Sequence, residues 1–452
     1  MKLRLALLTL ITLSGIFTTA QSKAVTKVVA DLAFKSLGKP TTAEVNGFPS
    51  EYSYVWETTI AETEKQDVKI DFNTLNFFVG DKTDSQTWGI TCDPAKGCKP
   101  SNPSVTFNYP ALLGRGAVTG VTGEVNLTLT GTTNATAATN LVQTGNPFNG
   151  VNSIGLGPGG NFWKWLQTAG ALEDNVNIQF SINGGTLAEN LNNTSGKLKA
   201  AITLASSDPA NAITANPINP TGVSYYASWA FKGATLTAPY KNTTFNPFAP
   251  ANAPPAPEGD TVTLIQEGDL ICINPDVEEV MTLNVPLQTI QQFQTSFYAN
   301  VCSGAKNKND LLTKCTNGNN APKLTFKVDK ATYTITPNDY VYNVKTGSDT
   351  RATAAIGFTS GNTGIFAAGN VCEGAKAVLG RNFFTKYGLT LSVDKTLTKY
   401  SIGISAPGGG FGWLVWVLVI GAVLIIVGVI VMFVCNKGGD GDLDEPLNDY
   451  AK

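Results

Sequence analysis

The chain has 452 residues, a formal net charge of −2 and no histidine. Its length allows a sizeable core, and only 15% of its residues are charged, with no basic block, which argues against a nucleic-acid partner. The absence of histidine excludes Ser-His and Cys-His catalysis and histidine-based metal sites. We therefore expect no metal and no other cofactor.

Residues 1–24 predict a secretory signal peptide. They combine a basic start at Lys2 and Arg4 with an apolar stretch and with small residues at Ala20 and Ala24, either of which fits cleavage. A buried N-terminal helix is the alternative. We expect the chain to enter the secretory pathway.

Residues 25–50 form an N-terminal segment or a short pro-segment in this interpretation. Lys27, Lys35 and Lys39 give the segment some basic character, and no convincing processing site occurs in it. Whether the segment is removed or retained stays open at this point.

Strand-like runs dominate the chain from about residue 52 to residue 404. They are Tyr52–Ile60, Val68–Phe72, Leu75–Val79, Ser104–Tyr109, Val125–Thr130, Val176–Ile182, Lys197–Leu204, Tyr225–Leu236, Thr261–Ile265, Leu270–Ile273, Lys323–Val328, Thr332–Ile335 and Leu389–Val393. Asn161–Gly170 and Val285–Val301 favour short helices. The Pro/Ala-rich residues 246–259 predict an exposed loop, with a Pro-rich ligand segment as the alternative. The fold class is therefore mainly β.

One arrangement of a strand and a polar turn occurs twice. In residues 66–75, apolar and polar residues alternate before the tripeptide Asn73-Thr74-Leu75. The apolar run Leu270–Ile273 leads in the same way into Asn274-Pro275-Asp276. An apolar element with glycine follows each turn further along the chain, Ser153–Gly157 in the first half and Ala377–Gly380 in the second. Two halves with the same internal order predict a duplicated lobe.

Six cysteines precede the C-terminal apolar stretch, and this even number indicates disulfides formed in an oxidising compartment. Cys92 and Cys98 enclose a short loop and are predicted to pair. The other four allow three pairings; they are Cys272, Cys302, Cys315 and Cys372. Metal binding by these thiols is a poor alternative, because the chain has no CxxC motif and no histidine.

Acceptor sequons predict a glycoprotein. They begin at Asn126, Asn134, Asn192, Asn193 and Asn242. Because Asn192 and Asn193 are adjacent, we expect glycans at Asn126, Asn134, Asn242 and only one of this pair, taken here as Asn192.

Residues 411–434 carry no charge and are long enough to span a bilayer. Trp413 and Trp416 lie at the outer end of this stretch, where interfacial aromatic residues are common. Residues 406–410 form a glycine-rich hinge before it, and residues 435–452 form a short acidic tail after it. With the signal peptide, this pattern predicts a type I single-pass membrane protein with an acidic cytoplasmic tail.

Several segments resemble the pepsin-like aspartic proteases, peptidase family A1, over about residues 50–405. AVLGRNFFTKYGLTLSVD is similar to the closing turn, helix and strand of that family, and TEKQDVKIDFNTL to its run into the first Asp-Thr-Gly. SIGLGPG resembles the apolar-Gly turn of the first lobe, and PKLTFKVDKATYTITPNDYVY fits the second lobe. VTFNYPALLGRGAVTG resembles the flap hairpin, with Tyr109 at the flap tyrosine.

The resemblance implies a bilobal pepsin-like fold, with an N-terminal lobe at residues 51–210 and a C-terminal lobe at residues 211–405. It also matches Cys92 and Cys98 to the first small disulfide loop of the family. A disulfide between Cys315 and Cys372 would suit its late disulfide.

The chemistry of the family needs two carboxylates that share one proton. The resemblance places Asn73 and Asn274 at these positions, and an amide is no general base. Leu75 and Asp276 stand at the glycine positions; Thr74 keeps the threonine of the first turn, and proline replaces it in the second. We therefore expect no pepsin-like catalysis. Asp81, within Asp81-Lys82-Thr83, and Asp276 are the fallback carboxylates.

The leading hypothesis is an inactive pseudoprotease that binds a peptide or protein in a groove beside Thr74 and below the flap at Tyr109. A divergent active aspartic endopeptidase that uses Asp81 or Asp276 is the first alternative. A structural or adhesive surface glycoprotein is the second. The cell surface and an acidic endomembrane compartment both fit the predicted topology.

Overall fold

A computed structural model describes the chain over residues 27–36, 52–60, 65–80, 92–108, 117–127, 135–142, 152–168, 177–182, 200–205, 208–209, 211–239, 261–277, 279–302, 318–346, 349–354 and 356–405. The chain divides into two units, Met1–Ala406 and Pro407–Lys452. All described residues belong to the first unit. The predicted signal peptide, membrane span and acidic tail lie outside them, and no helix in the described ranges is both long and apolar enough to cross a bilayer.

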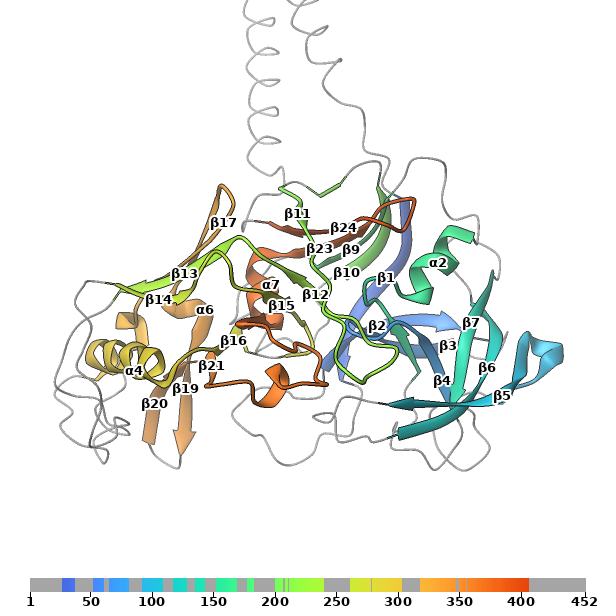
Figure 1. The fold of residues 1–452 in the computed structure, drawn as a ribbon, viewed down its shortest axis with the longest axis horizontal. Helices are drawn as coiled ribbons and strands as arrows, with labels where there is room; N and C mark the ends of the chain where they lie inside the picture. Colours follow the sequence, from blue (N-terminus) through green and yellow to red (C-terminus); the bar gives the residue numbers. More distant parts are fainter. Residues whose placement is uncertain are drawn as a thin grey trace, which may run out of the picture. The chain divides into compact units, whose positions relative to one another are not determined.

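The described part is mainly β (Figure 1). The first half contains β1 (Lys27–Ser36), β2 (Tyr52–Thr59), β3 (Lys65–Asp71), β4 (Phe77–Gly80), β5 (Cys98–Asn108), β6 (Ala117–Leu127), β7 (Ala135–Val142), β8 (Ser153–Gly155), α2 (Asn161–Thr168), β9 (Asn177–Ile182) and β10 (Ala200–Ala205), with a 3-10 turn η1 (Pro94–Lys96).

The second half continues with β11 (Ile213–Thr214), β12 (Trp229–Phe231), β13 (Ala234–Pro239), β14 (Thr261–Ile265), β15 (Ile271–Ile273), β16 (Met281–Asn284), α4 (Leu287–Val301), η4 (Gly318–Asn320), β17 (Leu324–Val328), β18 (Ala331–Ile335), α6 (Pro337–Tyr340), β19 (Val341–Thr346), β20 (Asp349–Ala354), β21 (Ile356–Thr359), η5 (Gly364–Phe366), β22 (Ala377–Leu379), α7 (Arg381–Tyr387), β23 (Leu389–Val393) and β24 (Tyr400–Ile404).

The same four-strand arrangement occurs in both halves. In the first half, β8 lies between β3, to which it is parallel, and β4, to which it is antiparallel, and β4 pairs in parallel with β7. In the second half, β22 lies between β15 and β16 with the same directions, and β16 pairs in parallel with β21. The sequence prediction of a repeated internal order thus has a direct counterpart in the strand topology.

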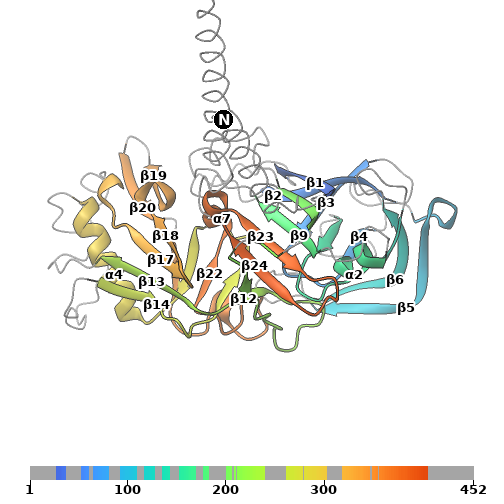
Figure 2. The same cartoon turned by 90° about the horizontal axis from the view of Figure 1, so that it is seen from above.

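An antiparallel pair, β9 with β23, joins the two halves through backbone hydrogen bonds (Figure 2). Its central register position pairs Phe180 with Leu391, and both side chains are fully buried. The pair belongs to a sheet with the strand order β11-β24-β23-β9-β10-β1-β2-β3-β8-β4-β7-β6-β5. Strands from both halves therefore share one sheet.

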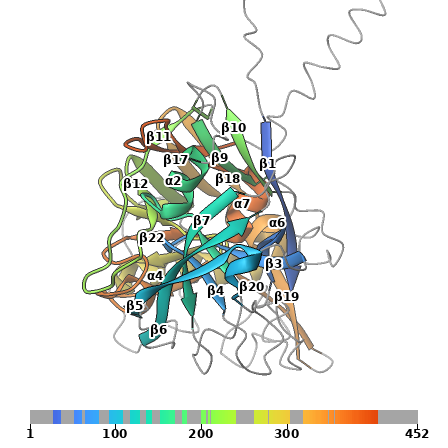
Figure 3. The same ribbon diagram turned by 90° about the vertical axis from the view of Figure 1, so that its right-hand side faces the viewer.

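Strand β1 occupies an interior place in that sheet, between β10 and β2. Figure 3 shows it beside β10. Its residues fall within the segment 25–50, for which the sequence analysis predicts no strand. Leu32 pairs with Ala200 on one side and with Trp56 on the other, and all three are buried. Ten residues of the N-terminal segment are thus an integral part of the folded sheet.

The predicted strands match the observed strands where the apolar runs are short and bounded by turn residues. Thr261–Ile265 and Leu389–Val393 have the predicted bounds. The predicted run Tyr225–Leu236 is instead split into β12 and β13. The reason is Gly233, which has a φ of 87° and interrupts the extended conformation in the middle of the run.

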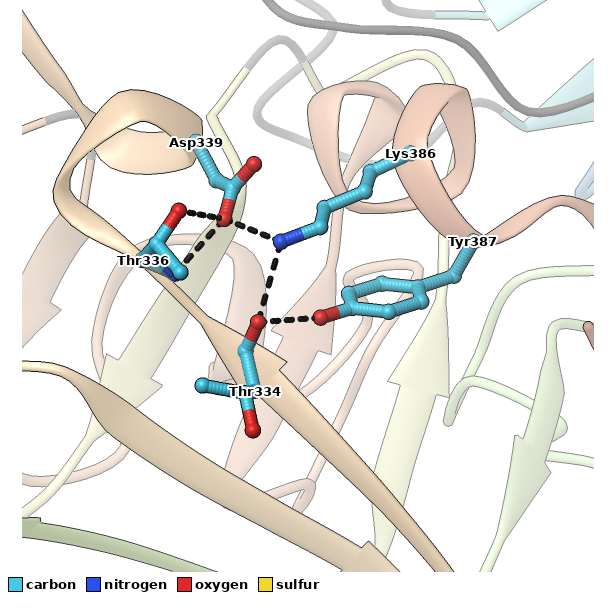
Figure 4. A network of polar contacts seen from close by, with 5 residues as sticks. All are labelled: Thr334, Thr336, Asp339, Lys386 and Tyr387. Atoms are coloured by element: carbon cyan, nitrogen blue, oxygen red, sulfur yellow. Dashed lines mark hydrogen bonds and ion pairs between the residues drawn. The ribbon is translucent and has the colours of Figure 1, made fainter. Parts of the chain in front are cut away.

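Helix α7 follows β22 and is held in place by a polar network (Figure 4). The Lys386 ammonium donates to the Asp339 carboxylate and to the carbonyl oxygen of Thr334, the latter at 2.9 Å. The same Asp339 carboxylate accepts hydrogen bonds from the backbone and hydroxyl of Thr336 and so caps α6. The Tyr387 hydroxyl also donates to Thr334. The network therefore connects α7 to β18 and α6.

Candidate functional site

The first polar turn follows β3, whose two faces differ in burial. Val68 and Ile70 are fully buried, whereas Lys69 and Asp71, on the other face, are half-buried. At the end of the strand, Asp71 Oδ1 accepts hydrogen bonds from the backbone N–H groups of Asn73, at 3.0 Å, and Thr74, at 3.1 Å. The carboxylate therefore closes its own turn with one oxygen.

The second polar turn follows β15 and is built in the same way. Asn274 Oδ1 accepts a hydrogen bond from the backbone N–H of Asp276 at 3.1 Å. The Asn274 backbone N–H donates to the carbonyl of Leu379 in β22 at 3.0 Å. Only 5% of Asn274 is exposed. In both halves the chain after the strand is thus closed by a side-chain oxygen, from Asp71 in the first half and from Asn274 in the second, which accepts the N–H two residues later.

The strand register shows which residues of the two turns correspond. In the first half, Ile70 pairs with Ile154, and the next pair is Asp71 with Gly155. In the second half, Ile273 pairs with Leu379, and the residues that follow are Asn274 and Gly380. The register therefore matches Asn274 with Asp71, two residues before Asn73. Sequence reasoning missed Asp71 as a candidate site residue.

The two glycines of these pairs are required by close backbone approach. A Cβ on Gly155 would lie 2.3 Å from the carbonyl oxygen of Thr74. A Cβ on Gly380 would lie 2.1 Å from the carbonyl oxygen of Glu279. Real Cβ atoms do not approach so closely, so each glycine lets its strand pass directly against the neighbouring turn.

Asn73 points into the protein instead of the half-buried face of β3. It is 4% exposed, and its side-chain Oδ1 lies 2.9 Å from Ser228 Oγ, which also donates to the carbonyl of Val371. The Ser228 hydroxyl has one proton and cannot donate to both acceptors. When the Asn73 amide is turned so that its NH2 group faces Ser228 Oγ, the NH2 group donates to Ser228 and the Ser228 hydroxyl donates to the Val371 carbonyl. The Asn73 carbonyl accepts the N–H of Ala227 at 2.9 Å. Asn73 therefore fixes the first turn against the segment before β12.

Thr74 is only 1% exposed and packs against Gly155. Its backbone forms a bridge with Tyr226, and within the described ranges its hydroxyl has no hydrogen-bond partner. The structure thus places Thr74 in the packed interior of the turn, not on the face that carries Asp71.

An ion pair connects the strand of the first turn to the second turn. Lys69 Nζ lies 3.8 Å from Asp276 Oδ1, and about a quarter of each side chain is exposed, 24% and 25%. Burial raises the pKa of the nearby Tyr54 phenol above its ordinary value, while Arg381 lowers that pKa and Asp276 raises it. The Lys69 side chain therefore reaches from β3 to the second turn, and cationic as well as acidic groups lie near Tyr54.

Several predicted residues lie outside the described ranges: Tyr109, Asp81, Cys315, Asn134, Asn192 and Asn242. The sequon residue Asn126 is described and belongs to β6. Its side-chain nitrogen lies over Gly97, only 2.2 Å from the place of a Cβ on that glycine. In the described part of the chain, no group of three or more acidic or cysteine side chains is arranged to hold a metal.

Two disulfides are formed between described residues. The predicted pair Cys92–Cys98 is confirmed, with Cα atoms 5.1 Å apart. The expected pair Cys315–Cys372 is wrong, because Cys372 bonds to Cys272 with Cα atoms 5.7 Å apart.

The loop after β21 brings Cys372 to β15, where the Lys376 N–H donates to the Leu270 carbonyl at 2.8 Å. Cys302 is disulfide-bonded as well. Such bonds are typical of the secretory pathway.

The comparisons with known proteins bear on the second half of the chain. Residues 281–397 match the model of the family described as eukaryotic aspartyl protease. No curated protein matches the sequence. The matched segment runs from β16 to the turn after β23 and includes Gly380, but it begins after Asp276 and contains neither polar turn. The chain thus contains an aspartyl protease-like domain over residues 281–397.

Proposed function

We propose that this protein is a membrane-anchored, pepsin-like pseudoprotease that binds a peptide or protein at its two polar turns without cleaving it. The observation that carries the proposal is the match between Asp71 and Asn274. The two residues follow equivalent register positions and close their turns with the same hydrogen bond, yet one is a carboxylate and the other an amide.

One carboxylate cannot perform the paired chemistry of an aspartic protease. That chemistry needs one ionised carboxylate to activate water and one protonated carboxylate to protonate the substrate. An asparagine amide neither accepts nor releases a proton under working conditions. General acid–base catalysis contributes about 10²- to 10⁴-fold to a rate, and this contribution is lost at Asn274.

The residues that follow the two site positions support the same conclusion. In the register alignment, Phe72 follows Asp71 and Pro275 follows Asn274. Phe72 is fully buried and stacks edge-on against Tyr54 and Phe180 in the core. Neither residue has a hydroxyl group, so in this alignment both turns lack the threonine hydroxyl that the resemblance implies at these positions.

Asp276 does not replace the missing carboxylate in this proposal. Its carboxylate already contacts Lys69, with Asp276 Oδ1 3.8 Å from Lys69 Nζ. Its backbone N–H is also committed to Asn274 Oδ1. These contacts favour a structural role for Asp276 over the alternative of a divergent active peptidase.

The test is a cleavage assay on the purified full chain in detergent, with denatured globin as substrate between about pH 3 and 7. We expect no cleavage by the wild type and slow, pepstatin-sensitive cleavage by Asn274→Asp. Asn73→Asp is the matched amide-to-acid control and should stay inactive. Wild-type cleavage that pepstatin abolishes would refute the proposal.

The anchoring part of the proposal rests on the apolar residues 411–434 and the predicted signal peptide. In membranes, alkaline carbonate should leave the chain in the pellet. A protease added to the face of the membrane that carries the acidic tail should remove only a small C-terminal fragment. Release of the chain into the carbonate supernatant would contradict the membrane anchor.

A further inference from the structure

The sequon residue Asn126 lies directly against the small loop that the Cys92–Cys98 disulfide closes. A Cβ placed on Gly97 of this loop would have three nearest atoms, and all belong to the Asn126 side chain: Nδ2 at 2.2 Å, Cγ at 2.6 Å and Cβ at 3.1 Å. The Asn126 side chain is therefore folded flat over Gly97, where only the hydrogen of a glycine fits. The Asn126 backbone N–H also donates to the Gly97 carbonyl at 2.9 Å.

We propose that a glycan on Asn126 and the closed Cys92–Cys98 loop exclude each other, so that disulfide formation decides whether this sequon is used. The residues Asn126-Leu127-Thr128 form the acceptor pattern. Glycan transfer forms a bond between Asn126 Nδ2 and C1 of the first sugar and releases one amide proton. It breaks the bond between C1 and the diphosphate of a lipid-linked oligosaccharide donor.

The product of this transfer does not fit the contact between the side chain and the loop. A sugar ring on Nδ2 is much larger than the single carbon for which there is no room at Gly97. The modified side chain therefore has to leave Gly97, or the loop has to move away from Asn126. The inference concerns maturation of the chain and does not depend on the proposed pseudoprotease function.

The loop is held at this place by contacts of its own besides the disulfide. The Asp93 carbonyl accepts the Cys98 N–H at 3.1 Å, which tightens the turn. Cys98 is fully buried and pairs in register with Val125, the residue before Asn126. Because both ends of the turn are fixed, Gly97 stays over the sequon once the disulfide has formed.

Strand β6 is paired on both sides at the sequon. Besides its bond to the loop, Asn126 pairs with Thr136 of β7, and Leu127 pairs with Ala135. Leu127 is also fully buried. A glycosyltransferase therefore reaches this sequon only before the sheet has formed around it, and the order of glycan transfer and loop closure decides the outcome.

The loop and its contact with Asn126 depend only on a local part of the chain. Both cysteines precede Asn126 in the sequence, and β5 and β6 are consecutive antiparallel strands. Local pairing of this kind needs no later segment, and closing so short a loop costs little chain entropy. We therefore expect the loop to close first in the wild type and to leave Asn126 unmodified.

The experiment reads both modifications on the full chain after expression in secreting eukaryotic cells. Thiols are alkylated at lysis, and glycans are then removed enzymatically in water labelled with heavy oxygen, which marks each modified asparagine as a labelled aspartate. Mass spectrometry of the peptides should show an unmodified Asn126 and a Cys92–Cys98 disulfide in the wild type. In Cys92→Ser/Cys98→Ser most molecules should carry the labelled aspartate at position 126.

Cys272→Ser/Cys372→Ser is the matched control, because it removes the other disulfide and leaves the small loop intact. Slower folding of this variant should not lead to a glycan on Asn126. The nearby sequon at Asn134 is the internal reference, and its occupancy should be the same in all three chains. The readout is covalent, so it does not require that a variant fold.

Three results would overturn the inference. They are wild-type molecules that carry both the Asn126 glycan and the Cys92–Cys98 disulfide, an unmodified Asn126 in Cys92→Ser/Cys98→Ser, and a glycan on Asn126 in Cys272→Ser/Cys372→Ser molecules whose small loop is closed. If a fraction of the wild type carries the glycan, the inference requires that Cys92 and Cys98 be alkylated in that fraction.

Discussion

Trp163 and Trp229 direct their indole N–H groups at the same carbonyl oxygen. Trp163 in α2 lies 3.3 Å from the oxygen of Leu156, and Trp229 in β12 lies 2.7 Å from it. Their rings meet edge to face at 6.3 Å. Leu156 follows Gly155, the register partner of Asp71. Buried aromatic residues from both halves of the chain therefore support the strand beside the first polar turn.

Trp229→Phe is expected to lower the free energy of unfolding by about 1–2 kcal/mol, because it removes a short buried hydrogen bond. Trp163→Phe should cost less, since the Trp163 N–H is shared between Leu156, at 3.3 Å, and Gly157, at 3.1 Å. Urea denaturation of both variants checks this order. A larger loss for Trp163→Phe would contradict it.

The Lys69–Asp276 ion pair is expected to show a coupling energy of about 0.5–1 kcal/mol in a double-mutant cycle with Lys69→Met and Asp276→Asn. About a quarter of each side chain is exposed, so water screens the pair only partly. The Lys65–Glu57 pair is the matched control, because its side chains are 73% and 50% exposed. Its coupling should be near zero, and an equal coupling would show that the contact at the turns has no special environment.

Asn73→Asp and Asn274→Asp should differ in stability although both place an acid where an amide is buried. The new carboxylate at 274 still accepts the Asp276 N–H. The one at 73 would face Ser228, whose hydroxyl already donates to the Val371 carbonyl. We expect Asn73→Asp to be less stable than Asn274→Asp at neutral pH by about 1–3 kcal/mol. Equal melting temperatures would argue against the assigned contacts.

The Glu373 carboxylate forms hydrogen bonds with Thr221 and Gly369, and its contribution to stability depends on pH. Its carboxylate accepts the Thr221 N–H at 2.6 Å, the Thr221 hydroxyl at 2.8 Å and the Gly369 N–H at 3.0 Å. These hydrogen bonds, led by that of the Thr221 N–H, lower the pKa of Glu373 below its ordinary value.

A carboxyl group whose pKa is lower in the folded state stabilises the fold above its unfolded pKa and loses this effect as pH falls through the folded pKa. Glu373→Gln should therefore lower the melting temperature at pH 7, and the difference should vanish on acidification below about pH 4. Thr221→Val should show the same trend. A difference that grows in acid would reverse the predicted sign.

Loss of the Cys272–Cys372 disulfide should destabilise the protein more than loss of Cys92–Cys98. The first bond closes a loop with a sequence separation of 100 residues, and the second one of only 6. The entropy model gives about 4.7 kcal/mol for a bond that closes a loop of about 100 residues and about 2 kcal/mol for one that closes a loop of about 6. Unfolding of Cys372→Ser and Cys98→Ser, each paired with replacement of its partner, checks this order. Similar losses would contradict it.

The strands that local patterns define were predictable from the sequence, and the identity of the first site residue was not. Alternation marks Asp71 as one more polar residue beside Lys69, on the half-buried face of β3. Its role depends on the parallel pairing with Gly155, far along the chain, and on backbone bonds that close the turn. The one local signal is that an aspartate at the end of a strand often accepts the N–H of the residue two positions later and so forms an Asx turn.

The missed strand β1 and the Cys272–Cys372 bond have similar causes. Residues 27–36 become a strand because β10 and β2 flank them on both sides, and that environment is tertiary. The disulfide forms because the loop after β21 folds back along β15. In both cases the structure formed depends on segments that are far apart in the sequence, and local sequence patterns do not reveal such contacts.

The pairing of β9 with β23 sets an order for biosynthesis. The partner of β9 on that side is made near the end of the chain, after residue 388, so the ribosome adds about two hundred residues between the two strands. At the usual rate of translation this takes on the order of ten seconds or more. A first half that folds as it emerges therefore keeps an open sheet edge at β9 until β23 has been made.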